Sequence, residues 1–374
     1  MEAALAGHEA VVSGLPDPLI LVSADGRITG ANPAARELCA ADPAGRDLAA
    51  VLRHPALLAA VDEVLTSAAQ RVVEFDTPGG VPRHFAARIA RLPAPTRDGT
   101  VAIIALHDLT ALKRAEQMRA DFIANASHEL RTPLTSLLGF IETLRGPARE
   151  DAAARERFLT VMYEQAARMS RLVEDLLSLS RIELHEHTPP HGRADVADLV
   201  RRVTGMLELQ ARRKAMRFVI ELPDLPPVAG DPDELIHVFQ NLLDNAIKYG
   251  RAGTEIRITG KPAAPGSAGA RRLGRAGVIV AVHDQGEGIE PKHLPRLTER
   301  FYRVDTARSR QLGGTGLGLA IVKHILNRHR GVLDIESTPG RGSVFTVYLP
   351  AATPARENPV PRPGNARRGR AASS

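Results

Sequence analysis

The residues with the clearest capacity for chemistry are His128 and Glu129, which are adjacent in the stretch ASHELRTPL, Ala126–Leu134. A carboxylate beside an imidazole can orient or deprotonate the ring through Nδ1, which leaves Nε2 free to attack phosphorus. Thr132 follows His128 by four residues, so on a helix its hydroxyl lies on the same face and could hold a water. The local pattern fits a nucleophile, and it also fits an exposed histidine without a role.

The segment around His128 has the apolar spacing of an amphipathic helix. The apolar positions follow steps of four and three residues, and they are Leu130, Leu134, Leu137, Ile141 and Leu144. On a helical wheel His128 points away from this stripe, so we expect its ring to be exposed. Pro133 cannot donate a hydrogen bond to the Glu129 carbonyl, which predicts a bent and loosened turn beside the histidine.

A second amphipathic helix follows a break at Gly146-Pro147, with apolar positions from Phe158 to Leu179. Two such helices with a short connection predict an antiparallel hairpin. A hairpin cannot bury its apolar stripe alone. The pattern therefore predicts a homodimer in which two hairpins form a four-helix bundle.

A second set of polar residues lies on the predicted helix ELIHVFQNLLDNAIKYG, Glu234–Gly250. Asn241, Asn245 and Lys248 are on the face opposite the apolar positions. Two amide oxygens and one cation suit a metal–phosphate complex, and Mg²⁺ needs few protein ligands when phosphate oxygens complete its shell. A solvated helix face is the alternative. The chain has no G-x-x-x-x-G-K-[ST] motif, and DQGEG at Asp284–Gly288 lacks the third glycine of a dinucleotide fingerprint.

Several motifs, taken in order, resemble those of sensor histidine kinases. FIANASHELRTPLTSLLGFIETL, Phe122–Leu144, resembles the phosphoacceptor H box, and its end, Gly139–Leu144, is similar to the phosphate-regulon sensor subgroup. The helix with Asn245 resembles the N box, DQGEGI the G1 box, RFYRVD the F box and GGTGLGLAIVKHI the G2 box. TPGRGSVFTVYLP is similar to the closing strand pair of the same ATPase domain.

The resemblance implies an ATP site and assigns residues to it. The implied ATP-binding residues are Asn241, Asn245, Lys248, Tyr249, Asp284, Gly286, Gly288, Arg303, Gly314, Thr315, Gly316, Leu317 and Gly318. Asn245 would ligate Mg²⁺, and Asp284 would accept a hydrogen bond from the adenine amino group. Arg303 would reach the phosphates from a mobile lid, and the glycines would let backbone approach the nucleotide without a Cβ in the way.

The implied function is that of a two-component sensor. ATP would phosphorylate His128, and the phosphoryl group would pass to an aspartate of a response regulator, with phosphate starvation as the signal that the subgroup favours. Glu129 and Thr132 would support dephosphorylation of the regulator. Two alternatives share this fold. One is a regulator dominated by phosphatase activity, and the other is a non-catalytic scaffold, which would require the loss of Asn245, Asp284 or a glycine.

The first 110 residues have short β-like runs separated by turns. The predicted strands are Pro18–Val22, Arg71–Phe75, His84–Ile89 and Thr100–Leu106, with a hairpin turn at Asp25-Gly26. DPLILVSADGRITGANPAARELCA, in which Asn32-Pro33 enters a helix, resembles the opening of a PAS sensor domain. A generic α+β domain is the alternative.

These patterns predict a multidomain α+β chain. We expect a PAS-like α/β sensor at residues 1–110, the helical hairpin at 111–188 and an α/β-sandwich ATPase of the gyrase, Hsp90 and histidine-kinase type at 189–352. Within the last domain, Gly260–Gly277 is predicted as a surface loop between two strands. Residues 353–374 are predicted as a disordered basic tail.

Composition limits the partners. The formal net charge is +6, but five arginines and one glutamate after Pro354 contribute +4 of it, and only 3% of residues are aromatic, so no nucleic acid is expected. The single cysteine, Cys39, fits a reducing compartment. No apolar run approaches a membrane span of about 18 residues, and the N-terminus lacks a signal-peptide pattern. We expect a cytoplasmic chain that senses directly, receives its signal from a membrane-associated partner, or lacks the membrane region that most family members carry.

Overall fold

The computed structural model describes residues 12–39, 42–67, 69–77, 82–186, 188–190, 192–305 and 313–352. The chain divides into two compact units, residues 1–124 and residues 125–374. The predicted tail at 353–374 lies outside the described residues.

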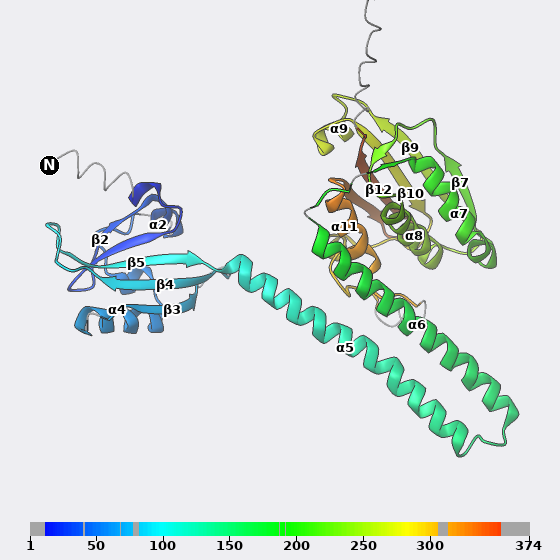
Figure 1. The fold of residues 1–374 in the computed structure, drawn as a ribbon, viewed down its shortest axis with the longest axis horizontal. Helices are drawn as coiled ribbons and strands as arrows, with labels where there is room; N and C mark the ends of the chain where they lie inside the picture. The colour runs from blue at the N-terminus through cyan, green and yellow to red at the C-terminus, as the bar shows by residue number, and fades with distance from the viewer. Residues whose placement is uncertain are drawn as a thin grey trace, which may run out of the picture. The chain divides into compact units, whose positions relative to one another are not determined.

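The N-terminal unit is built on a five-stranded antiparallel sheet with strand order β2-β1-β5-β4-β3 (Figure 1). Its strands are β1 (Leu19–Ser23), β2 (Ile28–Ala31), β3 (Arg71–Asp76), β4 (His84–Arg91) and β5 (Thr100–Asp108). Its helices are α2 (Pro33–Leu38), α3 (Leu48–Val51) and α4 (Pro55–Ser67). The four predicted strands are confirmed, each within a few residues. Alternate residues of β5 are buried, which leaves the other face of this strand partly accessible.

Asn32 explains how the chain turns from β2 into α2. Its Oδ1 accepts the amide hydrogens of Ala35 and Leu19, each at 2.9 Å, so the side chain both caps the helix and binds the start of β1. Pro33 follows at the first helical position, where a missing N–H costs nothing. The Asn-Pro pair therefore ends one element and begins the next.

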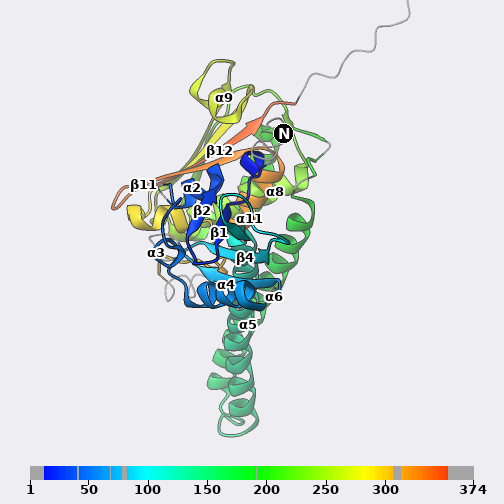
Figure 2. The ribbon, with the colours of Figure 1, turned by 90° about the vertical axis from the view of Figure 1, so that its left-hand side faces the viewer.

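Two long antiparallel helices follow, α5 (Thr110–Arg145) and α6 (Ala152–His185). Helix α5 continues through Pro133, whose side chain is buried, while His128 is exposed as predicted. Across the hairpin the rings of Phe140 and Phe158 lie 5.2 Å apart. In Figures 1 and 2 the turn between the helices projects beyond the C-terminal sheet.

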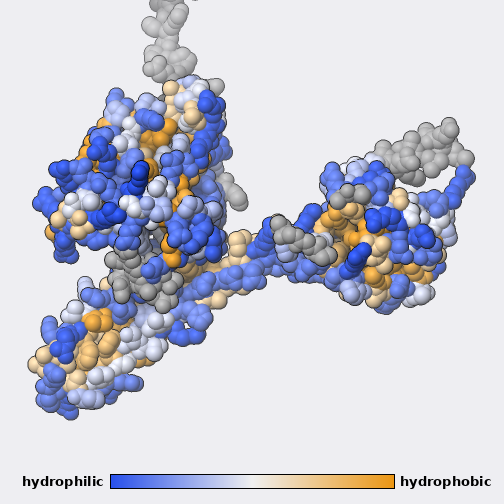
Figure 3. Space-filling model, turned by 180° about the vertical axis from the view of Figure 1, so that it is seen from behind, coloured by the Kyte–Doolittle hydropathy of each residue, from blue (hydrophilic) through white to orange (hydrophobic). Residues whose placement is uncertain are grey.

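The hairpin of a single chain leaves large apolar side chains in solvent. The exposed ones toward its turn are Leu134, Leu138, Ile141, Leu159 and Tyr163. Figure 3 shows apolar surface gathered at this end of the hairpin. Two positions of the predicted stripe, Leu134 and Ile141, are 48% and 39% exposed, so one hairpin does not bury its own stripe.

The C-terminal sheet has five strands in the order β11-β12-β10-β9-β7, in which only the pair β7 and β9 is parallel. Its strands are β7 (Arg217–Glu221), β9 (Glu255–Ala263), β10 (Gly277–Asp284), β11 (Val332–Thr338) and β12 (Gly342–Pro350). A small separate sheet pairs β6 (Arg193–Ala194) with β8 (Val228–Ala229).

The helical layer of this domain positions the site. Its elements are α7 (Val196–Arg213), α8 (Pro232–Tyr249), the 3₁₀ helix η1 (Pro291–Arg296) and α11 (Gly318–Arg328). Figure 2 shows α8 and α11 on the same side of the sheet. The five apolar residues predicted to share one side of α8 are all buried, namely Leu235, Phe239, Leu242, Leu243 and Ala246. The opposite side of α8 is consequently free to carry polar residues.

The prediction of a loop at Gly260–Gly277 is wrong in part. Strand β9 continues to Ala263, and a short helix, α9 (Ala268–Leu273), precedes β10. Ser267 caps this helix by accepting the Ala270 amide hydrogen, and Gly274 ends it in the left-handed conformation. The glycine- and alanine-rich composition hid a helix because its first turn depends on a single cap.

Among the described residues, no helix is both long and apolar enough to cross a membrane.

Candidate active site

A cavity of about 610 Å³ lies between α8, the segment after β10, the start of α11 and helix α6 of the hairpin. Nearly all of the predicted ATP-binding residues line it, namely Asn241, Asn245, Lys248, Tyr249, Asp284, Gly286, Gly288, Arg303, Gly314, Thr315, Gly316 and Gly318. Leu317 differs: its side chain is fully buried in the core, and its amide N–H donates to the Thr315 hydroxyl at 3.3 Å. The motif glycines and polar residues thus meet in one place.

Helix α8 presents its polar stripe to this cavity. Asp231 caps the helix by accepting the amide hydrogens of Asp233 and Glu234, which fixes where the helix begins. Lys248 Nζ lies 2.6 Å from the Asp244 carboxylate, one turn earlier. The cation is therefore already balanced by a neighbouring carboxylate before any phosphate binds.

The close approach of α11 to α8 requires a glycine. A Cβ on Gly318 would lie 2.4 Å from Oδ1 of Asn241, whose Nδ2 donates to the His237 carbonyl at 2.9 Å. A Cβ on Gly288 would lie 2.1 Å from the Thr338 carbonyl oxygen. Both glycines line the cavity, but here they permit protein backbone to pack closely against protein.

Asp284, the last residue of β10, lines the cavity and is 9% exposed. Its Oδ1 accepts the amide hydrogens of Gly286 at 2.8 Å and Ser343 at 3.3 Å. Burial raises the pKa of Asp284, while the two amide hydrogen bonds act to lower it. Since Oδ1 takes both amides, Oδ2 is the atom that can accept a hydrogen bond from a ligand.

Arg303, Thr315 and the first residues of α11 also line the cavity. The Arg303 side chain is 4% exposed, and its guanidinium donates to the Thr315 carbonyl at 2.7 Å. A cation and the start of a helix in the wall of a cavity favour an anionic ligand beside them.

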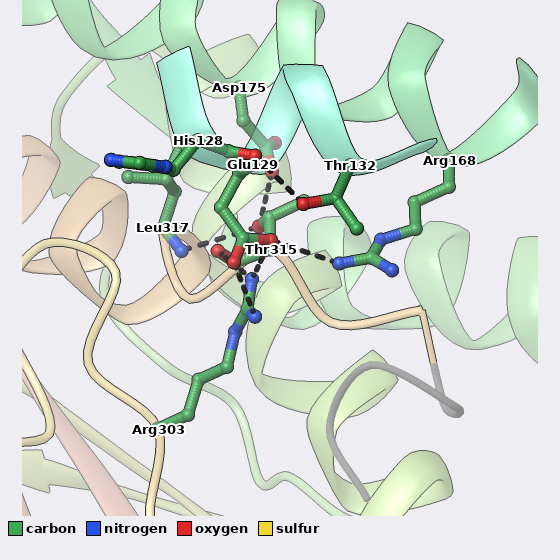
Figure 4. A network of polar contacts seen from close by, with 8 residues as sticks. All are labelled: His128, Glu129, Thr132, Arg168, Asp175, Arg303, Thr315 and Leu317. Carbon is green, nitrogen blue, oxygen red and sulfur yellow. Dashed lines mark hydrogen bonds and ion pairs between the residues drawn. The ribbon is translucent and has the colours of Figure 1, made fainter. Parts of the chain in front are cut away.

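The helix face that carries Glu129 contacts Arg303 of the cavity wall. Glu129 accepts two hydrogen bonds from Arg303, at 3.2 and 3.0 Å, and one from Arg168 of α6 at 2.9 Å (Figure 4). The His128 ring points away from the Glu129 carboxylate in the same view. Thr132 lies one turn later, and its hydroxyl donates to the His128 carbonyl at 3.1 Å. The structure thus places Glu129 on Arg303, whereas the sequence predicts a role for it at the histidine.

Sequence reasoning missed the contribution of helix α6. Arg168, Arg171 and Asp175 are spaced by three and four residues, so they share one face of the helix. Arg171 and Asp175 line the cavity, and the Thr315 hydroxyl donates to Asp175 Oδ2 at 2.7 Å. The spacing of these polar residues on α6 is the signal that could have found them, because it places them on the side of the helix that also carries the buried Leu172 and Leu179.

The donor chemistry of the cavity fits a Mg²⁺–nucleotide complex. Asn245 offers an amide oxygen on the cavity wall, and Mg²⁺ is commonly held by one or two protein oxygens together with substrate phosphates. Within the described ranges, no cluster of three or more histidine, cysteine, aspartate or glutamate side chains could hold a metal by itself. A metal carried in with the phosphates agrees with both observations.

Models of three protein families match the chain. The histidine kinase-, DNA gyrase B- and HSP90-like ATPase family matches residues 230–353, the His Kinase A (phospho-acceptor) domain matches 118–185, and the PAS fold matches 12–114. These ranges contain, respectively, the cavity, the hairpin with His128 and the N-terminal sheet. The domain boundaries near residues 110, 188 and 352 stay predictions.

Two relatives agree with these families. The phosphate regulon sensor protein PhoR of Pseudomonas aeruginosa is 34% identical over 355 residues, which are 94% of this chain and 76% of that protein. The sensor-like histidine kinase SenX3 of Mycobacterium tuberculosis is 36% identical over 254 residues, which are 68% of this chain and 59% of that protein. Among solved structures, the histidine kinase AdeS of Acinetobacter baumannii has a TM-score of 0.46 at 26% identity, over 60% of this chain and 98% of that one. Since the similarity to PhoR runs through all three matched domains, the chain belongs to the PAS-containing sensor histidine kinases.

Proposed function

We propose that this chain uses ATP to phosphorylate His128 and passes the phosphoryl group to an aspartate of a response regulator. The observation that carries the proposal is the network of Glu129, Arg303 and Thr315. It joins the neighbour of the phosphoacceptor histidine directly to a cavity lined by the ATP motifs. Phosphoryl transfer requires positioning and neutralisation of charge more than covalent help from the protein. In this network Glu129 can position the neighbouring histidine, and Arg303 can neutralise phosphate charge.

The residues of the cavity have separate roles in the proposed reaction. Asp284 accepts a hydrogen bond from the adenine amino group, and Tyr249 lies against the ring. Lys248 and Arg303 bind phosphate oxygens, and Asn245 holds Mg²⁺. When bound, Mg²⁺ neutralises charge on the phosphate oxygens. Glu129 orients the His128 imidazole through Nδ1, so that Nε2 faces the phosphorus.

We propose that the working form is a homodimer that joins two hairpins in a four-helix bundle. The exposed apolar residues of the hairpin support this, since a second copy would remove them from water. The partner that receives the phosphoryl group is a response regulator. A role in the response to phosphate starvation is supported by the similarity to PhoR alone.

A second activity, dephosphorylation of the regulator, is supported by Thr132. Its hydroxyl lies on the face of His128 and donates to the His128 carbonyl, which leaves its oxygen lone pairs able to hold a water. A chain in which this activity dominates would have the same fold. A non-catalytic scaffold is not favoured, because Asn245, Asp284 and the motif glycines are present and all of them line the cavity.

The test is phosphate incorporation from labelled ATP into wild type and His128→Gln. We expect the variant to lose acid-labile label entirely while it binds nucleotide with an affinity within about twofold of wild type, since His128 does not line the cavity. His185→Gln is the matched control, because His185 is another exposed histidine of the hairpin. Acid-labile label that persists on His128→Gln would contradict the assignment.

A further inference from the structure

Helix α6 forms part of the wall of the nucleotide cavity, although it belongs to the phosphoacceptor hairpin. The residues that it contributes are Arg171, Glu174, Asp175 and Ser178. The cavity is therefore shared between the two partners of the proposed reaction. Any movement of the hairpin changes the site that holds the nucleotide.

Two carboxylates of the hairpin bind side chains of the catalytic domain that line or face the cavity. Asp175 accepts the Thr315 hydroxyl at 2.7 Å, and Glu129 accepts two hydrogen bonds from Arg303 (Figure 4). A carboxylate and a phosphate present the same kind of anionic oxygens to a guanidinium. Glu129 and Asp175 thus make the contacts that oxygens of a bound phosphate would make.

Each contact leaves one polar group incompletely satisfied. Burial raises the pKa of Asp175, against the Thr315 hydrogen bond and the nearby Lys248, so its ionised form is poorly solvated. Within the described part of the chain, the buried Nε of Arg303 has no hydrogen-bond partner. An arriving phosphate could satisfy Arg303 more fully, while it would repel Asp175.

The geometry also indicates which phosphate is concerned. In the proposed function Asp284 binds adenine, whereas Arg303 and Thr315 are the cavity residues that contact carboxylates of the hairpin. The phosphoryl group that is transferred must come closest to His128, the neighbour of Glu129. It is the terminal phosphate, which ADP lacks.

We propose that Asp175 and Glu129 form a terminal-phosphate sensor, through which the hairpin distinguishes ATP from ADP. With ADP, the two carboxylates hold Thr315 and Arg303 and the hairpin stays docked. With ATP, the terminal phosphate takes over both groups and releases Glu129 from Arg303 toward its role beside His128. This inference rests on the proposed function. Because coupling is reciprocal, the docked hairpin must weaken ATP binding relative to ADP by the same factor.

A second set of contacts holds the hairpin on the catalytic domain outside the cavity. Arg300 donates to Glu183 at 2.7 Å, and Glu186 is bound by His324 and Asn327, each at 3.0 Å. Glu183 and Glu186 do not line the cavity. They therefore allow docking to be weakened without any change to the groups that meet the nucleotide.

The experiment measures the affinity of the full chain for Mg²⁺–ADP and for a non-hydrolysable Mg²⁺–ATP analogue by calorimetry. We expect Asp175→Asn to bind the ATP analogue on the order of tenfold more tightly, with ADP affinity unchanged, because only the terminal phosphate competes with this carboxylate. Glu174→Gln is the matched control. It removes the same charge from the cavity-facing side of the same helix, but its partner is Ser170 rather than a residue of the catalytic domain.

A second variant tests the docking itself. Glu183→Gln combined with Glu186→Gln should also raise affinity for the ATP analogue relative to ADP, since a weaker dock competes less with the terminal phosphate. The sensor is refuted if Asp175→Asn shifts both nucleotides equally, if Glu174→Gln has the same effect, or if the double variant leaves the ratio unchanged. A chain that binds neither nucleotide would instead overturn the proposed function.

Discussion

Two carboxyl groups, Asp284 and Asp175, line the same cavity, and desolvation by burial raises the pKa of both. They differ in what holds them. Asp284 is bound by two backbone amides of its own domain, which cannot turn away. Asp175 is bound by one side-chain hydroxyl of a domain other than its own.

The difference separates recognition from regulation. A group fixed by backbone is pre-organised and serves every nucleotide that carries adenine. A group held by an exchangeable side chain can be displaced, so it can report on what the cavity contains. Asp284 is thus expected to contribute affinity for both nucleotides, and Asp175 is expected to contribute discrimination between ATP and ADP.

The largest effect is expected for a substitution of Asp284, the carboxyl group that backbone amides hold. In Asp284→Asn the amide oxygen must stay at the Oδ1 position to accept the Gly286 and Ser343 amides. The NH₂ group then faces the adenine amino group, donor against donor. Loss of an ionic hydrogen bond and an unsatisfied donor together cost about 3–4 kcal/mol, or on the order of 100- to 1000-fold in affinity.

Calorimetry with ATP analogue and ADP checks this prediction. Both nucleotides should lose affinity equally, which is the opposite of the selective change expected for Asp175→Asn. Asp224→Asn, an exposed aspartate of the same domain, serves as the control. A loss confined to the ATP analogue would show that Asp284 does not recognise adenine.

The same comparison shows how far sequence reasoning could reach. Asn241, Asn245 and Lys248 share one short helix, so their common face follows from spacing alone, and the structure places all three on the cavity. Buried apolar residues on the opposite face of α8 confirmed the orientation. The motif also predicts Leu317 as a site residue, yet its side chain belongs to the core.

Contacts between distant segments could not be predicted in this way. Glu129 and Arg303 are 174 residues apart, and Asp175 and Thr315 are 140 residues apart. No periodicity relates such positions, because their meeting depends on how the hairpin docks on the catalytic domain. The motifs therefore predicted most of the residues that line the cavity, but they predicted neither the contribution of α6 nor which side chains are paired.

A second prediction concerns Thr132, because the helix face that it shares with His128 is expected to support two activities. In Thr132→Ala we expect autophosphorylation and phosphotransfer to persist, because the phosphoacceptor is His128. Dephosphorylation of the phospho-regulator should fall on the order of 10²-fold, because the hydroxyl that positions the attacking water is lost. The assay follows regulator phosphate over time, with a regulator identified by phosphotransfer profiling.

Thr143→Ala is the matched control for that variant. Thr143 lies on the same helix, and its hydroxyl makes the same kind of bond, to the Gly139 carbonyl at 2.8 Å. Unchanged dephosphorylation in Thr132→Ala would show that the hydroxyl is only a surface group of the helix. Equal loss of both activities would instead indicate a structural defect near Pro133.

The smallest expected effect is the pH dependence of nucleotide affinity that Asp284 causes. Because burial raises the pKa of Asp284, its protonation begins at a higher pH than for an ordinary aspartate. The adenine amino group needs the ionised acceptor, so below the raised pKa each binding event must first release a proton. ADP affinity of wild type should therefore fall as pH falls from about 8 to about 5, by a few-fold.

Asp284→Asn is the control, because its amide does not bind this proton. The pH dependence of its ADP affinity therefore reports all other titrating groups, including those on the phosphates. The ratio of wild-type to variant affinity should consequently shrink toward acid pH, and a constant ratio would show that Asp284 stays ionised throughout.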